Sequence, residues 1–171
     1  NNLISFYVLP EDIAISNVMG DIGSNLTTIF GEAVSAQYFL DGDYWTGSLM
    51  DIDISSGYWL RMADDDTLDG SGYPLNPGRI YNLHSGANLV SFPSTGSVNI
   101  GAGLPNDIEN NVIAVIGEGY SAINTDGVWG GSLLNFEALH GYWIITDDDI
   151  SFSFDLDEQE FLSRKSNPYK T

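Results

Sequence analysis

The chain has no cysteine among its 171 residues. This absence excludes a disulfide-stapled scaffold, a thiolate metal site and a cysteine nucleophile. Long apolar runs are also missing, because no stretch approaches the roughly 18 residues that a membrane-spanning helix needs. We therefore expect no membrane insertion.

Basic residues are scarce. Five Lys and Arg stand against 24 Asp and Glu, which gives a net charge of −19. A nucleic-acid-binding protein neutralises phosphates with clustered Lys and Arg, so this composition excludes nucleic acid as a partner and disfavours anionic membrane surfaces. Arg164, Lys165 and Lys170 follow the last acidic residue, and the rest of the chain has only Arg61 and Arg79 as cationic side chains.

What is present is the composition of a packed protein. Hydrophobic residues make up 43% of the chain and charged residues only 17%, unlike a disordered acidic segment. A chain of this length suits one larger domain or two small domains in close contact.

The strongest feature of the sequence is an internal duplication. The block Asn2–Phe6 returns 86 residues later as Asn88–Phe92, and three further blocks return in the same order. They are Gly-Glu (Gly31-Glu32 and Gly117-Glu118), Trp-x-Gly-Ser-Leu (Trp45–Leu49 and Trp129–Leu133) and Gly-Tyr-Trp (Gly57–Trp59 and Gly141–Trp143). Four blocks in one order, with a short insertion near Asp41 in the first copy, indicate two copies of one unit.

Turn-forming residues divide the chain between the copies. Asp, Gly, Asn and Pro crowd residues 64–78, and an alternating strand with a turn at residues 80–86 leads into the second copy. We predict repeat 1 at residues 1–66, a joint at 67–87, repeat 2 at 88–155 and a polar tail or linker at 156–171, with the repeats packed as one domain. The first copy has no such lead-in strand, so we expect that a longer parent chain precedes Asn1.

Each copy contains the same series of expected elements. Short β-branched or apolar runs predict strands, among them residues 26–30, 57–62, 112–116 and 141–145, and Asp41-Gly42 and Asp126-Gly127 predict hairpin turns. Apolar residues at helical spacing after Pro10 predict a short helix ending before Gly23, and the second copy predicts at most one or two turns between residues 104 and 108. The fold class is α+β and mainly β: two tandem, pseudo-twofold-related repeats with one or two short helices.

These motifs resemble a known repeat. The pattern NLISF, W-x-GSL and GYW, with an LHSGANLVSF joint, resembles a duplicated repeat of large exported or surface proteins of marine bacteria and of marine metagenomic sequences. The similarity covers most of residues 2–145. The resemblance implies an extracellular or cell-surface setting and supplies no established activity and no catalytic residues.

Glu32 and Glu118 are the candidates for catalysis. A twofold relation could bring these two equivalent carboxylates together, as a carboxylate-pair hydrolase requires. The alternative is that each Glu follows a Gly at the end of a strand and caps backbone amides or faces water. We favour that alternative, because functional carboxylate pairs are rare beside solvated ones, and we expect no catalysis.

Asp64, Asp65, Asp66 and Asp69 are the candidates for a metal site. They lie in a Gly-rich loop, and Ca²⁺ prefers several carboxylate and carbonyl oxygens on a flexible turn. The spacing does not match an EF-hand, and charge runs usually mark solvated loops. We therefore expect no cofactor, with Ca²⁺ as the one candidate ion.

Trp45, Trp129, Tyr58 and Tyr142 are the candidates for ligand binding. Aromatic rings at these recurring positions could stack on sugars, but duplicated folds also retain core residues at equivalent positions. Strand alternation predicts that one aromatic of each Gly-Tyr-Trp points inward and the next outward. We expect the Trp of each W-x-GSL block to be mostly buried.

The sequence favours a non-catalytic repeat module of a larger exported or surface protein, which acts as a structural spacer, adhesion unit or interaction unit. A virion surface would fit the composition equally well. A carbohydrate-binding module, with or without Ca²⁺, is the alternative, and a hydrolase that uses the two glutamates is the remote one. The expected partners are a glycan or protein at a surface and the rest of a longer chain.

Overall fold

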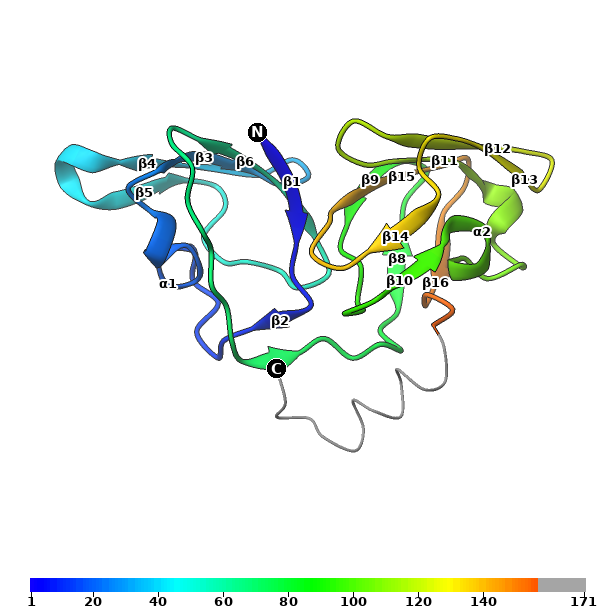
Figure 1. The fold of residues 1–171 in the computed structure, drawn as a ribbon, viewed down its shortest axis with the longest axis horizontal. Coiled ribbons are helices and arrows are strands. Elements are labelled where there is room, and N and C mark those ends of the chain that lie inside the picture. The colour runs from blue at the N-terminus through cyan, green and yellow to red at the C-terminus, as the bar shows by residue number, and fades with distance from the viewer. Residues whose placement is uncertain (157–171) are drawn as a thin grey trace.

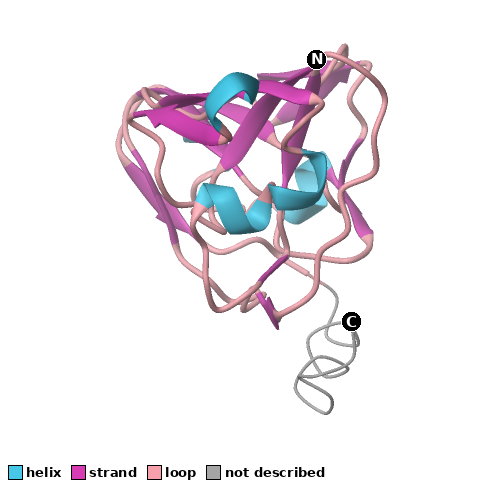
Figure 2. Ribbon diagram, turned by 90° about the vertical axis from the view of Figure 1, so that its left-hand side faces the viewer, coloured by secondary structure: helices cyan, strands magenta, loops and turns pink. Residues whose placement is uncertain are grey.

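The computed structural model describes residues 1–156, so the predicted tail lies outside the described residues except for Leu156. The fold is mainly β with two short α-helices, as the sequence predicts. Figure 1 shows two units side by side, and Figure 2 shows that strands and loops make up most of the molecule. No helix within residues 1–156 is both long and apolar enough to cross a membrane.

Each unit contains one five-stranded antiparallel sheet. The first sheet has the order β1-β6-β3-β4-β5 and the second has the order β13-β12-β11-β15-β9. The first is built from β1 (Asn2–Ser5), β3 (Leu26–Phe30), β4 (Ser35–Phe39), β5 (Tyr44–Gly47) and β6 (Gly57–Met62). The second is built from β9 (Gly86–Val90), β11 (Val112–Ile116), β12 (Ser121–Thr125), β13 (Val128–Gly131) and β15 (Tyr142–Thr146).

The two sheets correspond strand by strand, because each repeated sequence block occupies the same place in its own sheet. Even the irregularities match: the register shifts between Leu26 and Thr28 in β3, and between Val112 and Ala114 in β11. The predicted hairpin at Asp126-Gly127 joins β12 to β13, and both residues have the positive φ of a type I′ turn, 52° and 81°.

Three two-stranded sheets complete the fold. Of their strands, the sequence predicted only the lead-in at residues 80–86, which forms β8 and the start of β9. The pairs are β2 (Val8–Leu9) with β7 (Tyr73–Pro74), β8 (Tyr81–Leu83) with β16 (Ile150–Phe152), and β10 (Ser97–Asn99) with β14 (Asn135–Glu137).

The helices differ from the prediction in extent and place. The first copy has α1 (Ile15–Val18) and the 3₁₀ turn η1 (Gly20–Ile22) in place of one helix from Pro10, although the predicted apolar positions Ile15, Met19 and Ile22 are buried. The Met50 carbonyl accepts the Ile15 N–H at 2.8 Å, which satisfies one of the donors that the start of a helix leaves unpaired. Another 3₁₀ turn, η2 (Leu40–Gly42), forms at the insertion.

In the second copy a turn forms within the expected residues 104–108, where the Pro105 carbonyl accepts the N–H groups of Ile108 and Glu109, both at 3.1 Å. The α-helix itself lies earlier, as α2 (Ile100–Gly103), and the 3₁₀ turn η3 (Glu109–Asn111) follows. Asn99 caps α2 through its side-chain oxygen, which accepts the Gly101 N–H at 3.1 Å. Ile100 repeats the role of Ile15, since its N–H is bound by the Leu134 carbonyl at 3.0 Å. Packing and capping here override the low helix propensity of glycine.

Each unit has its own hydrophobic core. The first core gathers residues such as Met19, Ile29 and Tyr58. The second is rich in aromatic rings and includes Tyr81 and Leu83, which lie in β8. The second half of the predicted joint therefore packs into the second unit.

Candidate functional site

The contact between the two units is made by edge strands. Ser5 of β1 donates its N–H to the Leu139 carbonyl at 2.8 Å, and Ser91, which follows β9, donates to the Ser55 carbonyl at 2.9 Å. Ser5 and Ser91 are repeat equivalents, and so are Leu139 and Ser55. Each unit thus offers the same edge strand and the same turn to the other.

The two candidate catalytic glutamates take part in the same exchange. Glu32 accepts the Leu89 N–H of β9 at 2.8 Å, and Glu118 accepts the Leu3 N–H of β1 at 2.7 Å. Leu3 and Leu89 are again equivalents. Each glutamate follows a strand of its own sheet and caps an edge-strand amide of the other unit, which satisfies a donor that the ladder leaves unpaired. The sequence predicted that each glutamate caps backbone amides. In the structure the capped amide belongs to the other repeat, so each cap joins the two units.

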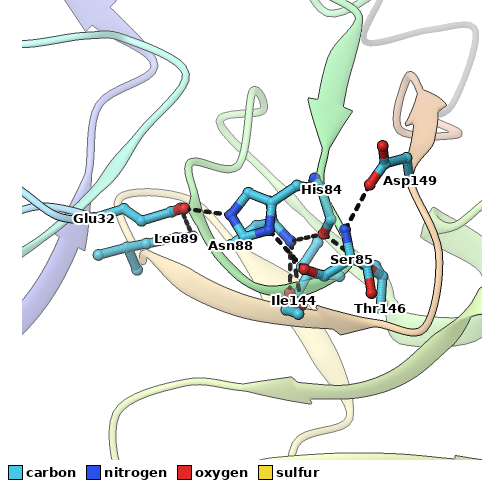
Figure 3. Close-up of polar contacts among 9 residues, drawn as sticks. Glu32, His84, Ser85, Asn88, Leu89, Ile144, Thr146 and Asp149 are labelled. Carbon is cyan, nitrogen blue, oxygen red and sulfur yellow. Dashed lines mark hydrogen bonds and ion pairs between the residues drawn. The ribbon is translucent and has the colours of Figure 1, made fainter.

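A histidine completes the Glu32 contact (Figure 3). His84 Nε2 lies 2.8 Å from the second Glu32 oxygen, and His84 Nδ1 lies 2.7 Å from the Ser85 carbonyl. A carbonyl and a carboxylate only accept hydrogen bonds, so both contacts are hydrogen bonds only when the ring is protonated. The Ser85 carbonyl and then the Glu32 carboxylate accordingly raise the pKa of His84 above its usual value.

The turn that carries His84 is held by the second unit. Asn88 and Thr146 both donate to the His84 carbonyl at 2.8 Å, and Asp149 accepts the Ser85 N–H at 2.8 Å (Figure 3). These bonds fix the backbone from which the imidazole reaches across to Glu32. Sequence reasoning treated His84 as an isolated histidine and missed this role, because its partner lies in the other repeat.

The glycines of the two Gly-Tyr-Trp blocks lie against the backbone of the other unit. A Cβ on Gly141 would stand 2.7 Å from the Ile4 carbonyl oxygen and 3.2 Å from the Gly57 Cα. A Cβ on Gly57 would stand 3.0 Å from the Val90 carbonyl oxygen. The repeated glycine is therefore required by backbone contact across the interface.

A cleft of about 610 Å³ opens beside Glu118. Leu3 belongs to its lining, and the ionisable side chains that line it are those of Glu118, Tyr120, Glu137, His140 and Tyr142. The equivalent carboxylate of the first copy is the one that His84 contacts.

The predicted aspartates do not converge. Asp64, Asp65, Asp66 and Asp69 are all exposed. Asp66 accepts hydrogen bonds from the Asn25 side chain and the Thr67 N–H, at 3.0 and 2.8 Å. Within residues 1–156, no group of three or more His, Cys, Asp or Glu side chains has an arrangement that could hold a metal ion. The Ca²⁺ hypothesis stays a prediction.

Two of the predicted ligand-binding aromatics are corrected by the structure. Tyr58 and Tyr142 are only 2% and 1% exposed, so neither ring is available to stack on a ligand. Their hydroxyls accept the N–H groups of Asp53 and Glu137, both at 2.7 Å. Burial raises the pKa of both phenols, that of Tyr142 to about 12. As strand alternation predicts, the next residue of each block, a Trp, is more exposed.

Trp45 and Trp129 are partly buried, which leaves part of each ring accessible. Trp129 donates its indole N–H to the Glu109 carboxylate. Trp45 packs on Tyr38, with ring centroids 5.2 Å apart, and borders a groove of about 380 Å³ that also contains Tyr44 and Asp51.

Comparisons with protein-family models, with curated proteins and with solved structures return no match to this chain.

Proposed function

We propose that this chain is a non-catalytic structural and interaction module, made of two repeats related by a pseudo-twofold axis, within a larger exported or surface protein. The observation that carries the proposal is the reciprocal capping of Leu3 and Leu89 by Glu118 and Glu32. A carboxylate that accepts a backbone N–H of the other unit stabilises the contact between the units. This supports a joining role for the two glutamates over a hydrolytic one.

The interface also supports a role as a unit in a larger assembly. Exposed edge strands invite uncontrolled pairing with other chains, and proteins usually cover or cap them. In this molecule the edge strands β1 and β9 each lie against the other unit, where the carbonyls of Leu139 and Ser55 accept the N–H groups of Ser5 and Ser91. A module built in this way keeps its edges protected while its outer faces stay open to partners.

The charge supports the proposed setting. A net charge of −19 keeps a protein soluble through self-repulsion, which salt water screens. Together with the resemblance of the sequence motifs, this favours an exported or surface location in a saline environment.

The test is whether the glutamates couple the two units. Each unit has two tryptophans. Replacing Trp45 and Trp59 by Phe leaves tryptophan fluorescence only from the second unit, and replacing Trp129 and Trp143 by Phe leaves it only from the first. With native glutamates, both probes should report one urea midpoint. Glu32→Ala together with Glu118→Ala should lower stability by about 1 kcal/mol per lost hydrogen bond and separate the two midpoints.

Glu11→Ala is the matched control, because Glu11 is exposed and its side chain makes no hydrogen bond within residues 1–156. It should change stability by no more than about 0.5 kcal/mol. Two separate transitions with native glutamates, or a double variant that unfolds like this control, would refute the coupling.

A carbohydrate-binding role is the second candidate, and the groove beside Trp45 favours it. Tyr44 is 52% exposed at this groove, and Asp43 and Asp51 place carboxylates beside the rings. Exposed aromatics with adjacent acceptors suit a sugar, which offers apolar faces and hydroxyl donors. A glycan array with and without Ca²⁺ would test this role. Binding that Tyr44→Ala abolishes would support it, and an array with no signal would remove it.

A further inference from the structure

The two repeated tryptophans differ in what their indole N–H groups meet. Trp129 in β13 donates to the Glu109 carboxylate. Trp45 occupies the equivalent place in β5, because the pairing of β4 with β5 has the same register as the pairing of β12 with β13. Within residues 1–156, the Trp45 indole N–H has no hydrogen-bond partner.

The difference comes from one residue. Glu109 and Gly23 are repeat equivalents, because each lies three residues before the corresponding strand, β11 or β3. Each also follows a buried isoleucine, Ile108 or Ile22, whose carbonyl accepts the backbone N–H three residues later at 2.9 Å. The first copy therefore has a glycine at the position from which the second copy supplies a carboxylate to its tryptophan.

Gly23 and Trp45 both line the groove of about 380 Å³ in the first unit. This volume lies within the range of about 300–1,000 Å³ that is usual for small-molecule sites. Tyr44 adds an exposed ring, whereas the second copy has Val128 at the equivalent position. The first copy thus combines an unpaired indole donor, an exposed aromatic ring and an open space between them.

We propose that this groove binds a neutral saccharide, one of whose hydroxyl oxygens accepts the Trp45 indole N–H as the Glu109 carboxylate accepts that of Trp129. An apolar face of the sugar packs on Tyr44, and its other hydroxyls donate to the carboxylates of the groove. This assignment rests on the carbohydrate-binding role proposed for the groove and deepens it by naming the class of sugar.

The charges of the groove select against acidic sugars. Its ionisable side chains are those of Tyr38, Asp43, Tyr44 and Asp51, and no Lys, Arg or His among residues 1–156 lines it. Two carboxylates without a cation repel a uronate or a sulfate. An ammonium group would suit the carboxylates, but it has no lone pair for the Trp45 N–H, whereas a hydroxyl both donates and accepts.

Gly23→Glu tests the assignment, because it gives the first copy the carboxylate that the second copy has. Gly23 has φ −51° and ψ −38°, which any residue adopts, and the atoms around its Cβ position lie 3.5 Å away or more. The variant should therefore fold. NMR should show that its Trp45 indole N–H exchanges more slowly with water. Gly70→Glu is the matched control, because it adds the same charge at an exposed glycine whose Cβ would meet no atom within 4 Å.

The probes are neutral oligosaccharides of glucose, mannose and xylose, and oligomers of galacturonic acid as the acidic arm, first on an array and then in calorimetry. We expect neutral sugars to bind and the uronates not to bind. Gly23→Glu should weaken binding by about tenfold or more, and Gly70→Glu should leave it unchanged. In the parent protein the sugar should shift the Trp45 indole signal and leave that of Trp129 in place, which decides the assignment even if Gly23→Glu does not fold.

A preference for uronates, an unmoved Trp45 signal, or neutral-sugar binding that survives Gly23→Glu would overturn the assignment and leave a carbohydrate-binding role in place. No binding in either arm would remove that role as well. The coupling of the two units, which the tryptophan probes measure in urea, is independent of all these outcomes.

Discussion

His84 is the residue in which sequence context and tertiary position differ most. In the sequence it is a single histidine in a turn, and in the structure it links the second unit to Glu32 of the first. Such a contact depends on pH, because the ring holds both hydrogen bonds only when it is protonated.

We predict that the His84 contact stabilises the fold at low pH. The Ser85 carbonyl and Glu32 raise the pKa in the folded state, with a smaller contribution from Asp149. The stabilisation is therefore fully present below the unfolded pKa of about 6.5 and is lost as pH rises through the higher folded value. An NMR titration should give a His84 pKa above 6.5. Glu32→Gln should lower it only part of the way, because the Ser85 carbonyl remains, and a native value at or below 6.5 would contradict the prediction.

The buried tyrosines give a second residue-level prediction. Tyr58→Phe and Tyr142→Phe each remove a hydroxyl that accepts a backbone N–H at 2.7 Å, which leaves a partly buried donor unpaired. Each change should cost about 1–2 kcal/mol in the free energy of unfolding, measured in urea. Tyr120→Phe is the control, because Tyr120 is 60% exposed, and it should lie within about 0.5 kcal/mol of the parent. Equal effects at all three sites would mean that the buried hydroxyls contribute nothing.

At the scale of elements, the central strands follow their sequence closely. The predicted strands at residues 26–30, 57–62 and 112–116 coincide with β3, β6 and β11. Their β-branched and apolar residues specify a half-buried sheet by local pattern alone. The helices were predicted less well. Gly101 and Gly103 have low helix propensity, so the sequence disfavours α2, which the Asn99 cap and the burial of Ile100 stabilise.

The approach of β6 and β15 to the opposite edge strands gives a prediction about glycine. Gly141→Ala would place a Cβ 2.7 Å from the Ile4 carbonyl oxygen, so the units would have to move apart. We expect a loss of about 1–3 kcal/mol in thermal or urea unfolding, typical of overpacking. Gly130→Ala is the matched control in β13, because its Cβ would meet no atom within 4 Å. If both variants are equally stable, the close approach at Gly141 is not required.

At the scale of the whole molecule, charge is the dominant property. Both ion pairs among the described residues use a histidine, and neither Arg61 nor Arg79 pairs with a described carboxylate. Most of the negative charge is therefore balanced only by solvent ions. Salt should screen the resulting repulsion, because the Debye length falls from about 30 Å at 0.01 M to about 3 Å at 1 M.

We predict that NaCl stabilises the protein. The melting temperature should rise by a few degrees between 0.01 and 0.5 M NaCl, since about 1 kcal/mol corresponds to about 2–4 °C at this chain length. CaCl₂ at matched ionic strength tests the aspartate hypothesis in the same assay. A larger, saturating rise that Asp66→Asn reduces would support a Ca²⁺ site, and an equal rise would assign the effect to screening. A melting temperature that falls with NaCl would contradict the prediction.

The sequence by itself determined the mainly β class, the duplication and most strands of the two sheets. These features follow from short-range patterns: β-branched runs, Asp-Gly pairs that favour hairpin turns, and blocks that recur in one order. The recurrence of Glu32 and Glu118 also predicted that the two residues have the same role, but it did not identify that role.

Only the tertiary structure decided what those residues touch. The caps on Leu3 and Leu89, the His84 contact and the approach at Gly57 and Gly141 all cross between the units. A local pattern reports which face of a strand is buried, but it carries no information about the register of one unit against another. That register depends on the packing of two complete sheets, so the contacts that join the repeats appear only when both units are in place.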